Sequence, residues 1–110
     1  MAELSRSLIP ASPVTPDQKQ FDYREMDDFY NKSLSEQTRQ SYRRVVRQFF
    51  TAHPNRHPAE ITPKQVLAWR DSLLKKKQKP NTVAFKLSII RSFYEYLRIG
   101  GLVTLNPAET

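Results

Sequence analysis

The sequence predicts an all-α domain, a compact bundle of four amphipathic helices around one core. Apolar side chains recur three and four residues apart along four segments, at about 22–32, 35–52, 62–77 and 81–99. Only two glycines occur in 110 residues, which is few for a β-rich fold with many tight turns. That length, with 38% apolar residues, suffices for one core and not for two.

Residues 1–20 are predicted to form a flexible N-terminal arm outside the bundle. Pro10, Pro13 and Pro16 stand there among serine, threonine, alanine and glutamine, a composition typical of linkers. The folded domain is therefore predicted over residues 21–100.

The first helix, about 22–32, is predicted from its N-terminal signals. Asp22 as N-cap and Glu25 three residues later form a capping-box pattern, and Phe21 and Met26 have the spacing of a hydrophobic staple. The side chains expected to face the core are Met26, Phe29 and Tyr30.

The second helix, about 35–52, combines an apolar face with a basic one. Ser35 is the predicted N-cap, and the helix is expected to end before His53, because a residue preceding proline disfavours the helical conformation. The apolar face consists of Tyr42, Val45, Val46 and Phe49, and the opposite face carries Arg39, Arg43 and Arg47.

The third helix, about 62–77, has the clearest start signal in the chain. Thr62 is the predicted cap, Pro63 occupies the first helical position, and Gln65 completes a capping box. The core side of this helix is expected to consist of Val66, Trp69 and Leu73.

The fourth helix, about 81–99, is expected to open at Pro80-Asn81. The pair Gly100-Gly101 predicts a left-handed cap at its end. Residues 101–110 are predicted to be the start of a linker, because Asn106-Pro107 prevents a return to helix. The apolar stripe consists of Val83, Leu87, Ile90, Tyr94 and Leu97.

The positive charge is concentrated in the last three predicted helices and indicates a polyanionic partner. Residues 35–100 hold fourteen basic and four acidic side chains, a net charge of +10, whereas the whole chain carries +7. A field this uneven attracts nucleic acid from one side. A basic face that only meets solvent is the alternative, and so is a face that binds an acidic protein.

Several other functions are not expected. The absence of cysteine excludes disulfides and thiolate metal sites and is typical of a cytoplasmic protein; no apolar run is long enough to span a bilayer. His53 and His57 are four apart, but Pro54 and Pro58 prevent the helix that would pair them on a metal. No glycine-rich phosphate loop occurs either, and we expect no metal, cofactor, membrane or small-molecule substrate for this chain.

Four segments, in this order and at this spacing, resemble a known family. They are "LSEQTRQSYRRVVRQF", "ITPKQVLAW", "KPNTVAFKLSIIRSFYEYL" and "NPAE". Together they are similar to the N-terminal core-binding, SAM-like domain of tyrosine recombinases, which include phage integrases and Xer-type and integron-type relatives. The resemblance covers roughly residues 21–109.

The resemblance implies a DNA-binding domain of an enzyme that integrates or recombines DNA. In the family this domain grips one face of duplex DNA through its second and fourth helices, and protomers contact one another. A separate C-terminal domain of the family holds the catalytic residues, so the resemblance implies no catalytic residue in this chain. The residues of this sequence that the resemblance and the charge pattern together assign to DNA are Thr38, Arg39, Gln40, Arg43, Arg47, Lys79, Asn81, Thr82, Phe85 and Lys86.

This sequence departs from the family pattern just before Lys86. Where the family often shows a polar and a basic residue, this chain has Ala84-Phe85, so Phe85 is expected either to touch a thymine methyl group or to pack in the protein.

Arg44 and Arg47 are the arginines most expected to contact only solvent. Arg91 could form a structural ion pair as readily as a DNA contact. A free-standing DNA-binding regulator is a further alternative.

Overall fold

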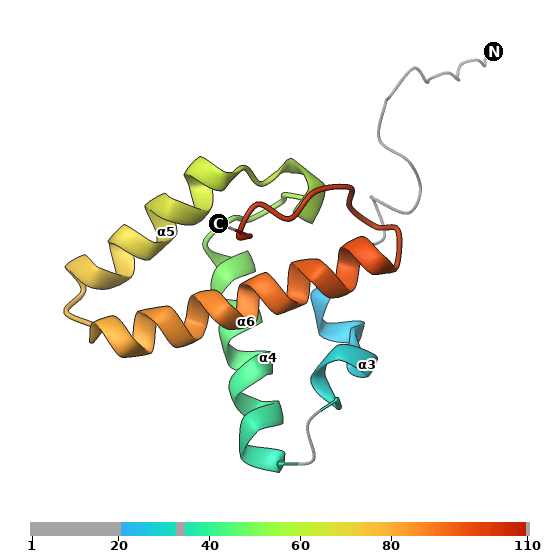
Figure 1. Ribbon diagram of the computed structural model, residues 1–110, viewed down its shortest axis with the longest axis horizontal. Coiled ribbons are helices and arrows are strands. Elements are labelled where there is room, and N and C mark those ends of the chain that lie inside the picture. The colour runs from blue at the N-terminus through green and yellow to red at the C-terminus, as the bar shows by residue number, and fades with distance from the viewer. Residues whose placement is uncertain (1–20, 33–34, 110) are drawn as a thin grey trace.

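The computed structural model describes residues 21–32 and 35–109, and every regular element in these ranges is helical. The predicted arm, residues 1–20, lies outside the described residues. The elements in chain order are η2 (Tyr23–Glu25), α3 (Asp27–Tyr30), α4 (Glu36–Thr51), η3 (Pro58–Glu60), α5 (Pro63–Lys75) and α6 (Pro80–Ile99) (Figure 1). The predicted all-α class is confirmed.

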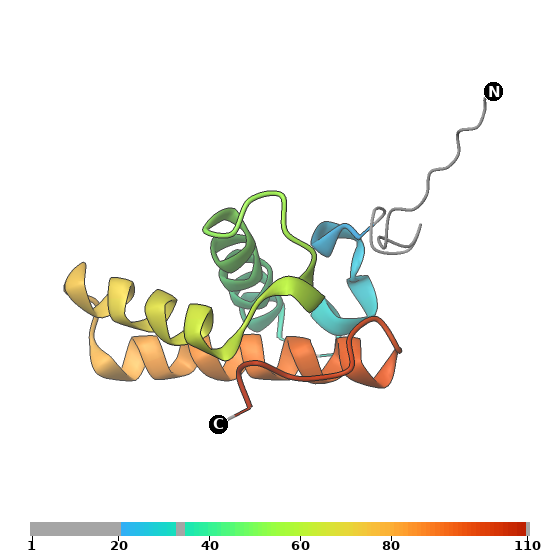
Figure 2. The ribbon, with the colours of Figure 1, turned by 90° about the horizontal axis from the view of Figure 1, so that it is seen from above.

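The long helix α6 organises the fold. It follows α5 in an antiparallel hairpin, and α4 crosses it steeply from behind (Figure 1). The short elements η2 and α3 lie against α4, and seen from above α5 lies alongside α6 while α4 stands behind them (Figure 2). The core therefore forms where α4, α5 and α6 meet.

Aromatic rings fill most of this core. Phe49 of α4 is fully buried, and its ring centroid lies 5.0 Å from that of Trp69 on α5 and 6.3 Å from that of Tyr94 on α6. Phe29 of α3 reaches Phe93 of α6 at 5.1 Å in an edge-to-face contact. Edge-to-face pairs add to the free energy of burial, so these rings hold the helices in a defined arrangement.

The prediction of one continuous first helix over 22–32 is wrong. The chain forms a 3₁₀ turn, leaves helical geometry at Met26 and then forms the four-residue α3. Asp22 accepts the N–H of Arg24 at 3.0 Å, a local bond that tightens the turn. The carbonyl of Tyr23 accepts the Tyr30 hydroxyl at 2.6 Å, so a side chain takes the acceptor that a longer helix would use for a backbone bond.

The other three helices lie close to their predicted bounds. Ser35 caps α4, and α4 ends at Thr51, before His53. Thr62 and Gln65 form the predicted capping box at the start of α5, which ends at Lys75 instead of 77. The turn η3 was not predicted, because its capping box is built by a histidine, His57.

The end of α6 is a Schellman motif, in which paired backbone bonds satisfy the last carbonyls. Gly100 is right-handed at φ −79°, and Gly101 alone supplies the predicted left-handed residue at φ +85°. The N–H of Leu102 donates to the carbonyl of Leu97 at 2.9 Å, the long bond of the motif.

α5 ends in the same motif, but its left-handed residue is Lys77, at φ +68°. A left-handed non-glycine residue costs about 1–2 kcal/mol, and glycine recovers only part of this because it is more flexible when unfolded. We expect Lys77→Gly to raise the free energy of unfolding by about 0.5–1 kcal/mol, measured by urea denaturation. Lys76→Gly removes the same charge at φ −82° and is the control; equal effects of the two changes would contradict the prediction.

Residues 102–109 fold back along α6 (red in Figure 1). Arg91 donates from Nε to the carbonyl of Ala108 at 2.9 Å, and Asn106 donates from Nδ2 to the carbonyl of Arg91 at 3.0 Å. Val103 and Ala108 are buried. The Arg91 side chain thus has a structural contact, whereas the division of the chain at residue 101 stays a prediction.

His57 is buried beside Phe21. Its Nδ1 accepts the N–H of Ala59 at 3.0 Å, and its Nε2 is buried without a hydrogen-bond partner among the described residues. Burial lowers the pKa of His57 from its usual 6.5, and Glu60 opposes this only in part. The described residues contain no cluster of three metal-ligating side chains.

The lowered pKa of His57 makes stability depend on pH. The unfolded chain binds the proton more readily, so the free energy of unfolding should fall as the pH drops below 6.5 toward the folded-state pKa. We expect His57→Asn, which keeps a capping side chain, to lose less stability than wild type between about pH 7.5 and about pH 5.5. Urea denaturation at both pH values measures this, and parallel losses in the two proteins would refute it.

Candidate nucleic-acid interface

α4 directs its basic side chains to two neighbouring regions of the surface. Val45, Val46, Phe49 and Phe50 take one side of the helix into the core. At about 100° per residue, Arg43 then falls at the edge of the buried side, and Arg44 falls on the side opposite the core. The contacts of each arginine follow this division.

Arg44, Lys76 and Lys86 form what we call the basic cluster. Lys86 is partly buried and donates from Nζ to Oε1 of Gln78 at 2.9 Å. Burial lowers the pKa of Lys86, and the charges of Arg44 and Lys76 lower it further, so both cations lie close enough to Lys86 to act on its charge. None of them forms an ion pair with a carboxylate in the described part of the chain.

The start of α6 adjoins the basic cluster. Lys79 is the N-cap residue, and no side chain caps this end of the helix. Free N–H groups and the helix dipole favour an anion at such a terminus. Asn81 and Thr82 are exposed in the first turn, and Phe85 is 48% exposed one turn later.

The start of α4 differs, because an acidic side chain occupies it. Glu36 accepts a bond from Nη2 of Arg39 at 2.7 Å and one from Nε2 of Gln40 at 3.3 Å. These bonds, chiefly that from Arg39, lower the pKa of Glu36. Thr38 is partly buried. The predicted DNA-binding residues Arg39 and Gln40 thus both donate to the carboxylate of Glu36 on the same helix.

Arg43 packs inward toward α3. Its guanidinium lies 4.7 Å from the centre of the Tyr30 ring, and its Nη1 lies 3.4 Å from Oδ1 of Asp27. Arg47, one turn further along α4, is exposed and makes no ion pair with a described residue. Both lie on an open depression of about 390 Å³, which we call the arginine cleft; it is lined by Tyr23, Arg24, Tyr30, Gln40, Arg43, Arg44 and Arg47.

The structure therefore separates the predicted DNA-binding residues into groups. Lys86, with Lys79, Asn81, Thr82 and Phe85, lies at the start of α6, and Thr38 and Arg39 lie at the start of α4. Sequence reasoning missed Arg44 and Lys76 as partners of Lys86. The signal for Lys76 was present, because a short connection between two helices must place the end of the first beside the start of the second.

A comparison with protein families identifies the family of this chain. The model of the family described as phage integrase, N-terminal SAM-like domain, matches residues 23–98, well over half of the chain.

The chain belongs to this family.

The matched range includes α4, α5 and nearly all of α6, so both the basic cluster and the arginine cleft belong to the integrase domain itself. Searches of curated proteins and of solved structures give no significant match. Among the described residues of this integrase domain, no helix is long and apolar enough to cross a bilayer. A closer relationship to Xer-type or integron-type proteins stays a prediction.

Proposed function

We propose that this integrase N-terminal domain binds double-stranded DNA through α4 and α6, as part of a cytoplasmic protein that integrates or recombines DNA. The observation that carries the proposal is the basic cluster, in which Arg44 and Lys76 lie close enough to Lys86 to act on its charge. None of the three cations forms an ion pair with a carboxylate of the described residues. Family membership supports the same function.

The electrostatics of the basic cluster favour a polyanion. Arg44 and Lys76 both lower the pKa of Lys86, so each of them repels the charge of Lys86 in the free protein. A row of phosphates relieves this repulsion and releases counterions into solution. The uncapped start of α6 adds N–H donors beside the cluster, and Phe85 offers an apolar contact for a thymine methyl group.

Cleavage and rejoining of DNA are proposed for a separate domain and not for this one. Tyr30 donates its hydroxyl to the carbonyl of Tyr23, and Tyr94 donates its hydroxyl to the carbonyl of Pro58 at 2.9 Å. Burial raises the pKa of both hydroxyls. Neither is therefore suited to attack a phosphate, and the domain's own task is to hold DNA and, with other recombinase protomers, to position the site.

The test is a titration of the wild-type chain into labelled duplex DNA, followed by fluorescence anisotropy at several salt concentrations. If Arg44, Lys76, Lys79 and Lys86 each neutralise one phosphate, the plot of log affinity against log salt should have a slope of about −3.6. Polyglutamate serves as a competitor of similar charge. Absence of binding at low salt would refute the proposal, and so would displacement of DNA by polyglutamate as effective as that by unlabelled duplex.

A further inference from the structure

The arginine cleft has a rigid aromatic floor. The ring of Tyr23 stacks on Phe50 with centroids 5.5 Å apart and an angle of 16° between the ring planes. The side chain of Tyr30 is almost fully buried, and its hydroxyl is fixed on the Tyr23 carbonyl. The partly exposed ring of Tyr23 is therefore the ring surface that the cleft offers, and it is positioned before any ligand arrives.

The rim of the cleft is positively charged. Two of its arginines are oriented by acids: Arg24 by Asp22 at 2.9 Å, and Arg43 by Asp27 at 3.4 Å. Arg44 and Arg47 have no acidic partner among the described residues. The cleft therefore keeps positive charge on one side of a flat, apolar surface.

Intact duplex DNA does not suit this shape. B-DNA presents phosphates on a convex outer surface and keeps its base faces stacked inside, so it cannot fill a concave site of about 390 Å³ with a ring floor. An unpaired nucleotide supplies both a flat base for the Tyr23 ring and a phosphate for the arginines. Aspartate and glutamate side chains supply the charge but not the flat surface.

We propose that the arginine cleft binds an unpaired nucleotide of a nucleic-acid strand. Arg44 belongs to both the cleft and the basic cluster, and Arg47 follows it by three residues, a rise of about 4.5 Å along the helix. A strand that separates from a duplex held on the basic cluster can thus pass directly into the cleft, because Arg44 belongs to both sites. Binding of an unpaired strand does not itself depend on the proposed duplex binding.

The test compares two variants that each replace one cation with an amide, Arg47→Gln in the cleft and Lys86→Gln in the basic cluster. Affinities of the full chain for a labelled oligothymidylate and for a blunt duplex are measured by fluorescence anisotropy at one salt concentration. We expect the ratio of single-strand to duplex affinity to fall about tenfold in Arg47→Gln and to rise in Lys86→Gln. An unchanged ratio in Arg47→Gln would overturn the inference.

An abasic oligomer of the same length separates base binding from phosphate binding. Wild type should bind it about tenfold more weakly than oligothymidylate, because the stacking of a base on an aromatic ring is absent. Equal affinities would overturn the inference, and so would polyglutamate that displaces oligothymidylate as well as unlabelled oligothymidylate does. If single strands bind as expected and duplex does not bind at all, the proposed function fails while this inference stands.

Discussion

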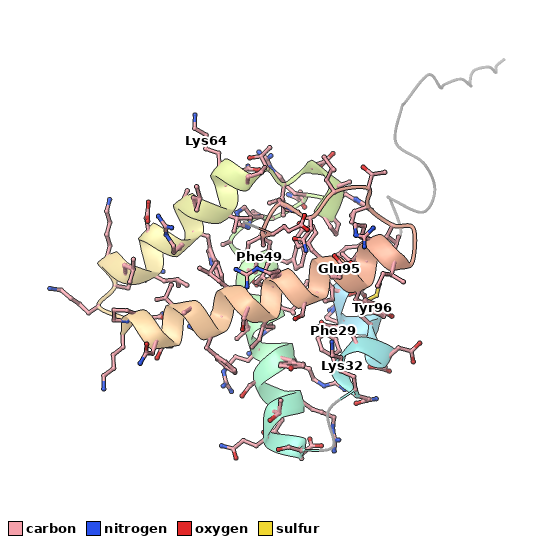
Figure 3. The ribbon with its side chains drawn as sticks, viewed as in Figure 1. Phe29, Lys32, Phe49, Lys64, Glu95 and Tyr96 are labelled. Atoms are coloured by element: carbon pink, nitrogen blue, oxygen red, sulfur yellow. The ribbon has the colours of Figure 1, made fainter. Side chains whose placement is uncertain are left out.

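Replacing Phe49 with alanine is expected to lower the free energy of unfolding by about 3–5 kcal/mol. Its ring is fully buried where α4 crosses α6 (Figure 3) and contacts Phe50, Trp69 and Tyr94 on three helices. Alanine would leave a cavity at the centre of the core. Domains of this size are stable by only about 5–15 kcal/mol, so a large share of the stability would disappear. Urea denaturation followed by far-UV circular dichroism measures it.

Phe85→Ala is the matched control for this change. The same atoms are removed from α6, but Phe85 is 48% exposed and is absent from the buried core. Its removal should cost less than about 1 kcal/mol. Similar losses of stability for the two variants would mean that Phe49 does not have the central role that its contacts indicate.

Reversing two charges of the basic cluster, with Arg44→Glu and Lys86→Glu together, is expected to weaken duplex DNA binding by about a hundredfold or more at about 0.1 M salt. Each change removes a charge-assisted interaction, worth roughly tenfold in affinity, and adds repulsion from the phosphates. The salt slope should also become less steep by about 0.9 for each phosphate that the protein no longer neutralises. Fluorescence anisotropy with labelled duplex measures both quantities. This prediction rests on the proposed function.

Lys64→Glu is the control for charge reversal. Lys64 lies at the start of α5 and points away from α4 and from the start of α6 (Figure 3). Twice its effect on the free energy of binding, which is the square of its fold-change in affinity, gives the weakening expected from net charge alone, since each substitution changes the charge by the same amount. If the double variant binds no worse than that, the basic cluster is not the DNA-binding surface.

The sequence predicted those parts of the fold that depend on neighbouring residues. Ser35 at the start of α4, and the Thr62–Gln65 box at the start of α5, each act through side chains within three residues of the groups they satisfy. The left-handed end of α6 likewise follows from a glycine pair. Such local signals need no knowledge of the tertiary structure.

The prediction of the first helix was wrong because its path does not depend on local signals alone. Its capping pattern was sound locally, but Tyr30 turns its hydroxyl back to the Tyr23 carbonyl, and the chain bends at Met26. So short a helix has little stability of its own, and tertiary packing decides its path. The pattern of residues 22–32 contains no sign of this contact.

The candidate site was predictable only in part, because it depends on how two helices cross. Helical spacing predicts which side chains share a face of α4, but not which residue of α6 lies opposite them. Lys86 was selected from its own helix, whereas its neighbour Arg44 was assigned to solvent. The angle between α4 and α6 brings the two together.

Two carboxylates described above, Glu36 against Arg39 and Asp27 against Arg43, act as counterions that the fold itself supplies. A phosphate that takes either arginine must displace a tethered anion, which does not diffuse away as a sodium or potassium ion neutralising the phosphate does. Displacing such a carboxylate therefore gains no translational entropy, because the carboxylate stays attached to the protein. Under the proposed function, the affinity of this domain for DNA is therefore set by the cations that have no carboxylate partner, and a count of all its arginines would overestimate that affinity.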